Sequence, residues 1–280
     1  MAGLGFFAAY ELIAMPALLD HTFVVPAFRD SPFLESCLDS LHAQSQSSHI
    51  ILATSTPSPF LEETAKKYAI PLLVHEPTTG IADDWTFAYN AATTRYITLA
   101  HQDDLYLPEY SARLVAAAER HPRALLVFSD YCDQVGNHLV ASSMNLVIKR
   151  FILFWFFAFH DAVSRPAVKK LMLSAGNPIP CPTVLFDREN VGEFRFSSEF
   201  SVDADWEAWL RLARYPGPFI RVPRRLVVHR IHAESETSAA IAASRRFLED
   251  EALFLSLWPK PIGRALSRLY SASYSSNRAR

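Results

Sequence analysis

Two adjacent carboxylates, Asp103 and Asp104, are the strongest candidates for chemistry in this sequence. They follow the apolar segment 96–100, which has the composition of a buried strand. In open α/β sheets, ligands bind at the carboxyl ends of the strands. A carboxylate pair at such a place can hold a hard divalent cation whose other ligands are phosphate oxygens. The same pair could instead form a turn or cap a helix.

Two further clusters could supply a base and another metal ligand. Asp203 and Asp205 stand at the start of an amphipathic helix predicted over 204–215, where the helix dipole favours a carboxylate. His229 and His232 follow a predicted strand, and an imidazole there could bind a metal. Helix capping is the alternative for the carboxylates, and a place on the surface or in the core is the alternative for the histidines.

The elements around these residues predict an α/β fold. From position 21 to about 128, short apolar runs alternate with amphipathic stretches, which is typical of βαβ units around a mostly parallel sheet. The predicted strands are 21–26, 49–53, 70–74, 96–100 and 124–128, and the helices between them are 32–44, 61–68, 81–93 and one that starts at Pro108. Later in the chain we predict a helix through Phe159, a pair of strands at 219–222 and 226–229, and helices at 239–257 and 261–270.

Composition excludes several classes of protein. The chain has 280 residues, half of them apolar, so it can bury the core of one large domain and disorder is excluded as the dominant state. Lys and Arg number 27 against 29 Asp and Glu, which gives no overall attraction to nucleic acid. The three cysteines form no CxxC or Cys/His cluster, so we expect neither a disulfide framework nor structural zinc, and a reducing, cytoplasmic setting.

Two apolar segments raise the question of a membrane. Residues 1–20 contain Glu11, end at Asp20 and lack a basic start, so they do not fit a signal peptide; we predict a helix packed on the domain or a loose end. The segment 151–159 has nine apolar residues, whereas a span needs about 20. We expect this segment to be mostly buried. The alternative is an interfacial segment that reaches a lipid-linked substrate.

The order of these segments resembles family 2 glycosyltransferases, an inverting family with the GT-A fold. Segments 24–28 and 33–44 resemble the opening strand and helix of the family, and segments 80–94 and 96–104 resemble its donor-site helix and its aspartate motif. Later in the chain, 177–183 resembles the acceptor segment, 205–212 the helix that carries the base, and 230–232 the closing Arg-x-His. The resemblance implies a GT-A domain over 21–237, with a donor half at about 21–130 and an acceptor half at about 131–237. Residues 1–20 then precede it, and 238–280 form helices packed on the same domain.

The resemblance also implies a role for each matching residue. Asp104 would bind Mn²⁺ or Mg²⁺ that bridges the donor diphosphate, Asp103 would contact the ribose or a metal-bound water, and His232 would complete the metal shell. Asp205 would be the general base, because the family has a carboxylate directly before an aromatic residue, with Asp203 as the rival. The remaining donor-site residues would be Pro26, Ala27, Phe28, Ser55 and Asp84.

Some positions depart from the family pattern. The family often has Asn at the positions of Arg29 and Thr86, Asp at the position of His101, and Asp in the loop 54–59. That loop carboxylate ordinarily contacts a uracil ring, and Asp84 could replace it.

The resemblance implies an inverting glycosyltransferase that moves a sugar from a nucleotide-diphosphate donor to a hydroxyl of a glycan or lipid-linked glycan. We place it in surface polysaccharide assembly, in the cytoplasm or peripherally at the cytoplasmic face of the membrane. One alternative is a catalytically degenerate binding or scaffold protein of an assembly complex. A nucleotidyltransferase is disfavoured because residues 26–36 contain no glycine for a phosphate loop.

Overall fold

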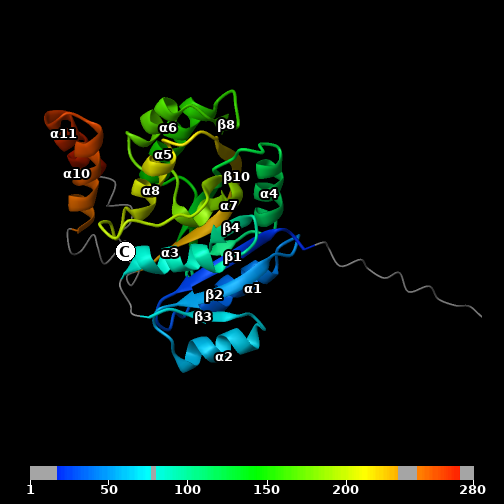
Figure 1. The fold of residues 1–280 in the computed structure, drawn as a ribbon. Helices are drawn as coiled ribbons and strands as arrows, with labels where there is room; N and C mark the ends of the chain where they lie inside the picture. Colours follow the sequence, from blue (N-terminus) through cyan, green and yellow to red (C-terminus); the bar gives the residue numbers. More distant parts are fainter. Residues whose placement is uncertain (1–17, 77–79, 233–244, 272–280) are drawn as a thin grey trace, which may run out of the picture.

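A computed structural model describes residues 18–76, 80–232 and 245–271 of the chain. Its centre is a mostly parallel ten-stranded sheet flanked by helices, which confirms the predicted α/β class (Figure 1). The strands run in the order β3-β2-β1-β4-β9-β6-β10-β5, with β7 on β6 and β8 on β10. The predicted helix at 1–20 and the start of the one at 239–257 lie outside the described residues.

The first half of the sheet is parallel and closely follows the predicted pattern. Its strands are β1 (His21–Ala27), β2 (His49–Thr54), β3 (Leu72–Val74) and β4 (Tyr96–Leu99). β1 pairs in parallel with both β2 and β4. In β1, Val24 contributes to one apolar core and Phe23 and Val25 to the other, because successive side chains of a strand point to opposite faces. The carboxyl ends of β1, β2 and β4 therefore meet at one edge.

The second half of the sheet departs from the prediction. It contains β5 (Leu105–Tyr106), β6 (Leu126–Val135), β7 (His138–Val140), β8 (Ala162–Val163), β9 (Val184–Asp187) and β10 (Phe219–Ile231). The predicted strand pair at 219–222 and 226–229 is wrong, since both segments belong to the single strand β10, parallel to β6. The pairing of β10 with β6 shifts register between Val222 and Val227, so Pro223 lies in a bulge of one continuous strand. The sequence indicates a turn at this position.

The helices cover both faces of the sheet. They are α1 (Leu34–His42), α2 (Pro59–Lys67), α3 (Ile81–Ala91), α4 (Tyr110–Glu119), α5 (Met144–Phe157), α6 (Pro166–Leu173), α7 (Arg188–Val191), α8 (Ala204–Leu212), α10 (Arg245–Leu257) and α11 (Lys260–Ser271), with a 3-10 turn η1 (Cys181–Thr183). Buried side chains of α1, α2 and α4 fill one core, and those of α3, α6, α8 and α10 fill the other.

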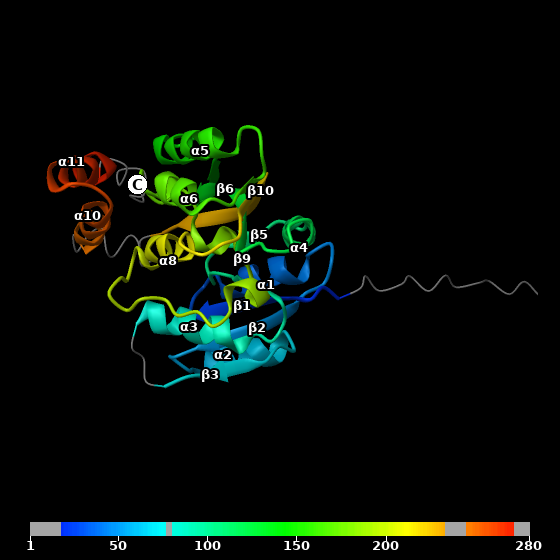
Figure 2. The ribbon, with the colours of Figure 1, turned by 45° about the horizontal axis from the view of Figure 1, so that its top comes forward.

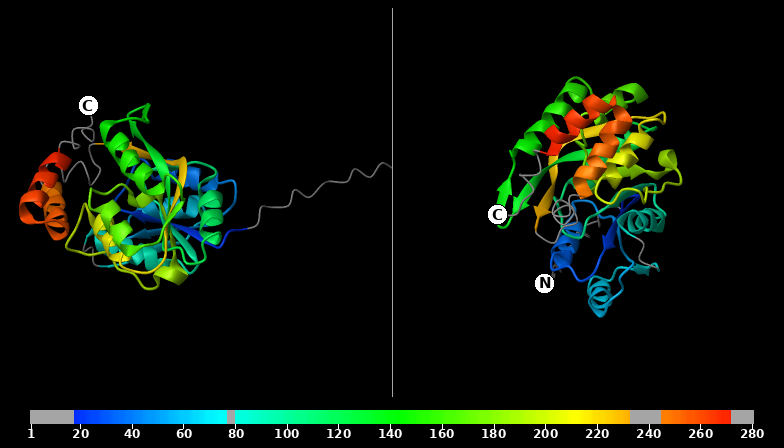
Figure 3. Two further views of the ribbon diagram at one scale, coloured as in Figure 1. Left: turned by 90° about the horizontal axis from the view of Figure 1, so that it is seen from above. Right: turned by 90° about the vertical axis from the view of Figure 1, so that its left-hand side faces the viewer.

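The C-terminal hairpin α10–α11 packs on α8 and α6 (Figure 3). The ring of Trp206 in α8 lies 5.0 Å from Phe254 and 5.9 Å from Tyr270. The indole of Trp258 donates a hydrogen bond to the Ser174 carbonyl. These contacts bring the α10–α11 hairpin against the helix whose first turn carries Asp205.

The expectation that residues 151–159 are mostly buried is wrong. Leu153 and Phe157 are buried, but Phe151, Trp155 and Phe159 are exposed by 61%, 68% and 93%. The apolar run exceeds what one face of α5 can bury, because a helix resting on the domain turns only one side towards the core. Within the described ranges, no helix combines the length and apolar character needed to cross a membrane.

Candidate active site

The segment after β4 lies beside the end of β1, at the carboxyl edge of the sheet. Gln102 and Phe28 hold the two strand ends together: the Gln102 amide accepts a hydrogen bond from the Phe28 N–H and donates one to its carbonyl, each at 3.2 Å. Cys37 of α1 donates to the His101 carbonyl, and the His101 ring lies 5.0 Å from that of Trp85 in α3. The segment is therefore fixed from both faces of the sheet.

Asp104 is fully buried. Its Oδ1 accepts a hydrogen bond from the Arg230 N–H at 3.0 Å, whereas its Oδ2 has no hydrogen-bond partner among the described residues. Burial and the neighbouring charge of Asp103 raise the pKa of Asp104 to about 7, with His229 partly opposing the shift. A buried carboxylate oxygen without a donor is suited to a cation.

Asp103 lies beside His232, the last residue of the Arg-x-His segment. Its Oδ2 is 3.0 Å from the His232 Nε2. Burial acts to raise the pKa of Asp103, but the hydrogen bond with His232 and nearby histidine charges hold it below its usual range. Arg230 also donates to the Asp103 carbonyl and to Ser36 of α1. Asp103 therefore stays ionised while Asp104 takes up a proton more easily.

His101 completes a cluster of candidate metal ligands that sequence reasoning missed. Ligand atoms of His101, Asp103 and Asp104 all lie within 4.8 Å of one another. The His101 Nε2 is buried and has no hydrogen-bond partner in the part of the chain that the structure describes. Burial lowers the pKa of His101 to about 4, so the imidazole is neutral at pH 7 and can donate a lone pair.

The three side chains therefore fit a divalent cation. Two carboxylates and a neutral imidazole are an O,O,N set that binds Mn²⁺ well. His101 and Asp104 each also have one buried side-chain atom, Nε2 and Oδ2, without a hydrogen-bond partner among the described residues. His232 contacts Asp103 directly and lies outside this cluster of mutually close atoms. The sequence offers one signal for this cluster. At position 101 the chain has a histidine, which can bind a metal, where the family often has an aspartate.

Asp205 lies in the first turn of α8 and is held by backbone donors. Its Oδ2 accepts from the Cys181 N–H at 3.2 Å and its Oδ1 from the Trp206 N–H at 2.7 Å. Burial raises the pKa of Asp205, and the charge of Lys149 and these hydrogen bonds offset part of the shift. A carboxylate with a raised pKa and a fixed orientation is suited to accept a proton.

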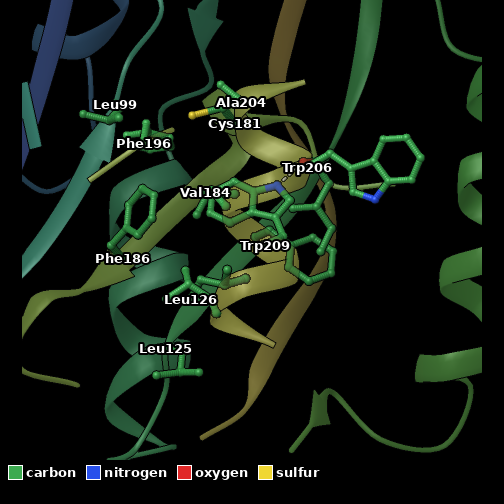
Figure 4. Close-up of a cluster of buried hydrophobic side chains, with 14 of the residues drawn as sticks. Leu99, Leu125, Leu126, Cys181, Val184, Phe186, Phe196, Ala204, Trp206 and Trp209 are labelled. Atoms are coloured by element: carbon green, nitrogen blue, oxygen red, sulfur yellow. Dashed lines mark hydrogen bonds between the residues drawn. The ribbon is translucent and has the colours of Figure 1, made fainter. Parts of the chain in front are cut away.

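Cys181 connects the two carboxylate sites. The Cys181 N–H donates to the Asp205 Oδ2 at 3.2 Å, and burial together with the charges of Asp205 and Asp104 raises the pKa of the Cys181 thiol. Figure 4 shows Cys181 above the side chains of Trp206 and Trp209. The two indoles donate to the carbonyls of Leu173 and Ile179 at 2.9 Å and 2.8 Å, which fixes the start of α8 against the segment before η1.

Asp203 has a different environment from Asp205. It is buried, and its side chain interacts with that of Asp250 in α10. Burial and the Asp250 charge raise the pKa of Asp203 well above its usual range. Asp203 therefore takes up a proton more readily than an exposed carboxyl group, and its side chain is engaged with Asp250.

The other predicted donor-site residues lie along the same edge of the sheet. Pro26 and Ala27 end β1, Phe28 follows it as an exposed side chain, and Ser55 follows β2 as a buried one. Asp84 lies in α3, and one of its oxygens is 3.5 Å from the His75 Nε2 after β3. These residues border the carboxyl ends of three neighbouring strands.

GT-A glycosyltransferases have a mostly parallel sheet with carboxylates after one of its central strands, as this chain has after its fourth strand. Residues 22–171 match the family model described as glycosyl transferase family 2. The chain therefore belongs to glycosyl transferase family 2, and it is an enzyme of the glycosyltransferase class. A comparison with curated proteins gives no match.

Solved structures share this fold at low sequence identity. S. aureus TarS 1–349 in complex with UDP-GlcNAc is 13% identical, with a TM-score of 0.60, over 92% of this chain and 73% of that chain. The mannosyltransferase PcManGT from Pyrobaculum calidifontis in complex with GDP-Man and Mn²⁺ is 16% identical, with a TM-score of 0.54, over 92% and 75%. Glucosyl-3-phosphoglycerate synthase from Mycobacterium tuberculosis is 16% identical, with a TM-score of 0.55, over 85% and 79%.

Proposed function

We propose that this glycosyltransferase moves a sugar from a nucleotide-diphosphate donor to a hydroxyl of a glycan or glycolipid, with inversion at the anomeric carbon. The observation that carries the proposal is the pairing of two sites around Cys181. One is the ligand cluster of His101, Asp103 and Asp104, and the other is Asp205. A metal-binding site next to a base fits direct displacement of a nucleotide diphosphate by a hydroxyl.

The donor side would hold the nucleotide diphosphate at the carboxyl edge of the sheet. Asp104 and His101 would bind Mn²⁺ or Mg²⁺, with Asp103 directed by His232 and Arg230. Such an ion supplies charge neutralisation for the leaving diphosphate. Pro26, Ala27, Phe28, Ser55 and Asp84 border the place where the nucleoside would lie, next to the reciprocal bonds between Phe28 and Gln102.

On the acceptor side, Asp205 would take the proton of the attacking hydroxyl. Burial raises the pKa of Asp205 above the usual range of an aspartate, which makes its carboxylate a stronger base. The backbone donors at Cys181 and Trp206 fix both oxygens, so the carboxylate keeps one orientation towards the acceptor. A PcManGT structure with GDP-Man and Mn²⁺ and a TarS structure with UDP-GlcNAc support a sugar-nucleotide donor.

We place the enzyme in surface polysaccharide assembly, in the cytoplasm and peripherally at the cytoplasmic face of the membrane. Support comes from the exposed apolar side chains of α5, which face outward at the end of the molecule that also holds the Asp205 helix.

Calorimetry with UDP and GDP tests the proposal. We expect at least one of the two to bind roughly tenfold or more tightly in Mn²⁺ than in chelator, because the cation offsets repulsion between diphosphate and carboxylates. Asp104→Asn should remove the difference, whereas Asp161→Asn, an exposed carboxylate that pairs with His121, should keep it. Equal affinity in Mn²⁺ and chelator contradicts the metal role. Binding of glycans without any nucleotide would favour the scaffold alternative.

A further inference from the structure

One face of α5 is an exposed apolar stripe. Its members recur at helical spacing of three and four residues, and none is covered by another described part of the chain; they are Met144, Val147, Ile148, Phe151, Phe154, Trp155 and, just after the helix, Phe159. The aromatic members contact each other edge to face, Phe151 with Trp155 at 6.0 Å and Phe154 with Trp155 at 6.2 Å. A soluble monomer rarely leaves so long an apolar patch uncovered.

The opposite face of α5 is firmly held by the domain. Leu146, Leu153 and Phe157 are buried, and Arg150 pairs with Asp130 at 2.9 Å and donates to the Tyr131 carbonyl at 2.6 Å. Ser143 caps the first turn through Leu146. The stripe is therefore a fixed feature of the fold, and α5 does not need to turn over to bury it.

The charged side chains of α5 and α6 are all positive, and the single carboxylate of residues 141–176 is Asp161, which lies between the two helices and pairs with His121 at 3.2 Å. Residues 141–160 and 162–176, which include α5 and α6, contain no Asp or Glu. Arg165 and Lys170 of the adjoining α6 segment are exposed, next to the exposed Leu171. α5 and α6 lie together at the end of the molecule opposite α2 and β3 (Figures 1 and 2).

We propose that the exposed face of α5 binds the surface of an anionic lipid bilayer, with its aromatic side chains among the acyl chains and Arg165 and Lys170 among the headgroups. A helix with aromatic side chains on one face and basic side chains at its edge lies in the plane of the interface. With 14 residues, α5 is too short to span.

A second copy of the chain fits this surface less well. Two α5 stripes packed on each other would bring the basic α6 segments of both copies close together, and Asp161, the one carboxylate of residues 141–176, already pairs with His121 at 3.2 Å. Like charges at such an edge oppose association, whereas anionic headgroups neutralise them. The charge pattern therefore favours a lipid partner.

Flotation with vesicles of phosphatidylglycerol and phosphatidylcholine tests the proposal on the full chain. We expect the wild-type protein to float, and the double variant Phe151→Gln/Trp155→Gln to lose roughly a hundredfold in partitioning, because two large apolar side chains no longer leave water. Gln keeps helix propensity, so α5 should stay folded, with an unchanged Tm as the check. Arg165→Gln/Lys170→Gln should lose about fivefold per charge, only on anionic vesicles.

Val74→Ser is the matched control, since Val74 is an exposed apolar residue of β3 at the other end of the molecule, and it should float like the wild type. Trp155→Phe should still float but lose the blue shift of tryptophan emission that vesicles cause in the wild type. The proposal is overturned if the wild type stays in solution, or if the Phe151→Gln/Trp155→Gln variant floats equally well. Sedimentation showing a dimer that this variant abolishes, without vesicle binding, would assign the face to a second copy.

Discussion

At the scale of single residues, His101 would give the proposed metal site a nitrogen ligand. Nitrogen ligands favour Mn²⁺ over Mg²⁺, which prefers oxygen and gives up its water reluctantly. We expect His101→Ala to weaken Mn²⁺ binding by roughly 10- to 100-fold, and His101→Asp to shift the preference towards Mg²⁺. Calorimetric titration of each metal into the protein measures both effects. An unchanged Mn²⁺ affinity in His101→Ala would remove His101 from the site.

The raised pKa of Asp104 predicts a pH-dependent metal affinity. The carboxyl group is protonated below about pH 7, and a cation must displace that proton, so Mn²⁺ affinity should fall by about tenfold per pH unit below about pH 7. Asp103, whose pKa is lowered, and His101, whose pKa is about 4, should not titrate in this range. Electron paramagnetic resonance of free Mn²⁺ measures the affinity without nucleotide. A flat profile between about pH 6 and about pH 8 would contradict the assignment.

Asp205 and Asp203 differ by their neighbours, and this difference predicts opposite outcomes. Asp205→Asn removes the proposed base while it keeps the first-turn polar group, so turnover should fall by roughly 10²-fold or more with little change in donor affinity. Asp203→Asn puts an amide of the same shape beside Asp250, where burial and the Asp250 charge already disfavour an ionised carboxylate, so most activity should remain. Steady-state transfer kinetics separate the two. If the variants exchange their effects, the base is Asp203.

At the scale of elements, α10 stabilises the start of α8 from outside. Glu249 accepts hydrogen bonds from the backbone N–H groups of Ser201, Val202 and Asp203, at 2.8 to 3.1 Å. One carboxylate thus satisfies the donors that precede the helix carrying Asp205.

Removal of this carboxylate should loosen α8. Glu249→Ala leaves three backbone donors without their partner, and we expect a loss of about 2 kcal/mol and a Tm lower by about 4–8 °C. Leu248→Ala, at an exposed neighbouring position, should leave the Tm nearly unchanged. Calorimetric melting of both variants checks this, and equal melting temperatures would show that α10 does not support α8.

The elements that the sequence predicts correctly are those with a strong local signal. β1, β2 and β4 are apolar runs bounded by polar segments, and their bounds agree with the structure to within a residue or two. The prediction of two strands in place of β10 was wrong because Pro223 looks like a break in the sequence. Only the pairing with β6 along the whole strand shows that the proline lies in a bulge. The prediction that residues 151–159 are mostly buried was wrong because apolar composition does not tell which faces of a helix have a neighbour.

The candidate site follows the same division between local and tertiary information. Asp103 and Asp104 could be found because they follow a predicted strand directly. The contact of Asp103 with His232 and the approach of Arg230 to Asp104 join positions more than a hundred residues apart, and only the resemblance to a family suggested that they meet. The unpartnered nitrogen of His101 depends on burial, which no spacing rule provides.

At the scale of the whole molecule, α5 connects the proposed bilayer surface with the acceptor side of the site. Its exposed stripe faces outward. On the inner side, Lys149 donates a hydrogen bond to the Tyr131 hydroxyl at 3.2 Å, and its charge acts to lower the pKa of Asp205. Burial lowers the pKa of Lys149 to about 8, with Asp205 among the charges that oppose the shift. One rigid helix thus touches both the surface and the surroundings of the base.

This connection predicts that a bilayer selects the acceptor. If α5 holds the enzyme on the membrane, a glycan carried on a lipid reaches Asp205 within a surface layer, where its effective concentration is far higher than in solution. Anionic vesicles should therefore raise kcat/KM for a lipid-linked acceptor by roughly tenfold or more, and leave transfer to the same glycan without its lipid unchanged. Phe151→Gln/Trp155→Gln should abolish the gain while it keeps the rate on the free glycan, because neither side chain touches the ligand cluster or Asp205. A gain that survives in this variant would show that the lipid acts on the acceptor alone and that α5 has no part in bringing the enzyme to it.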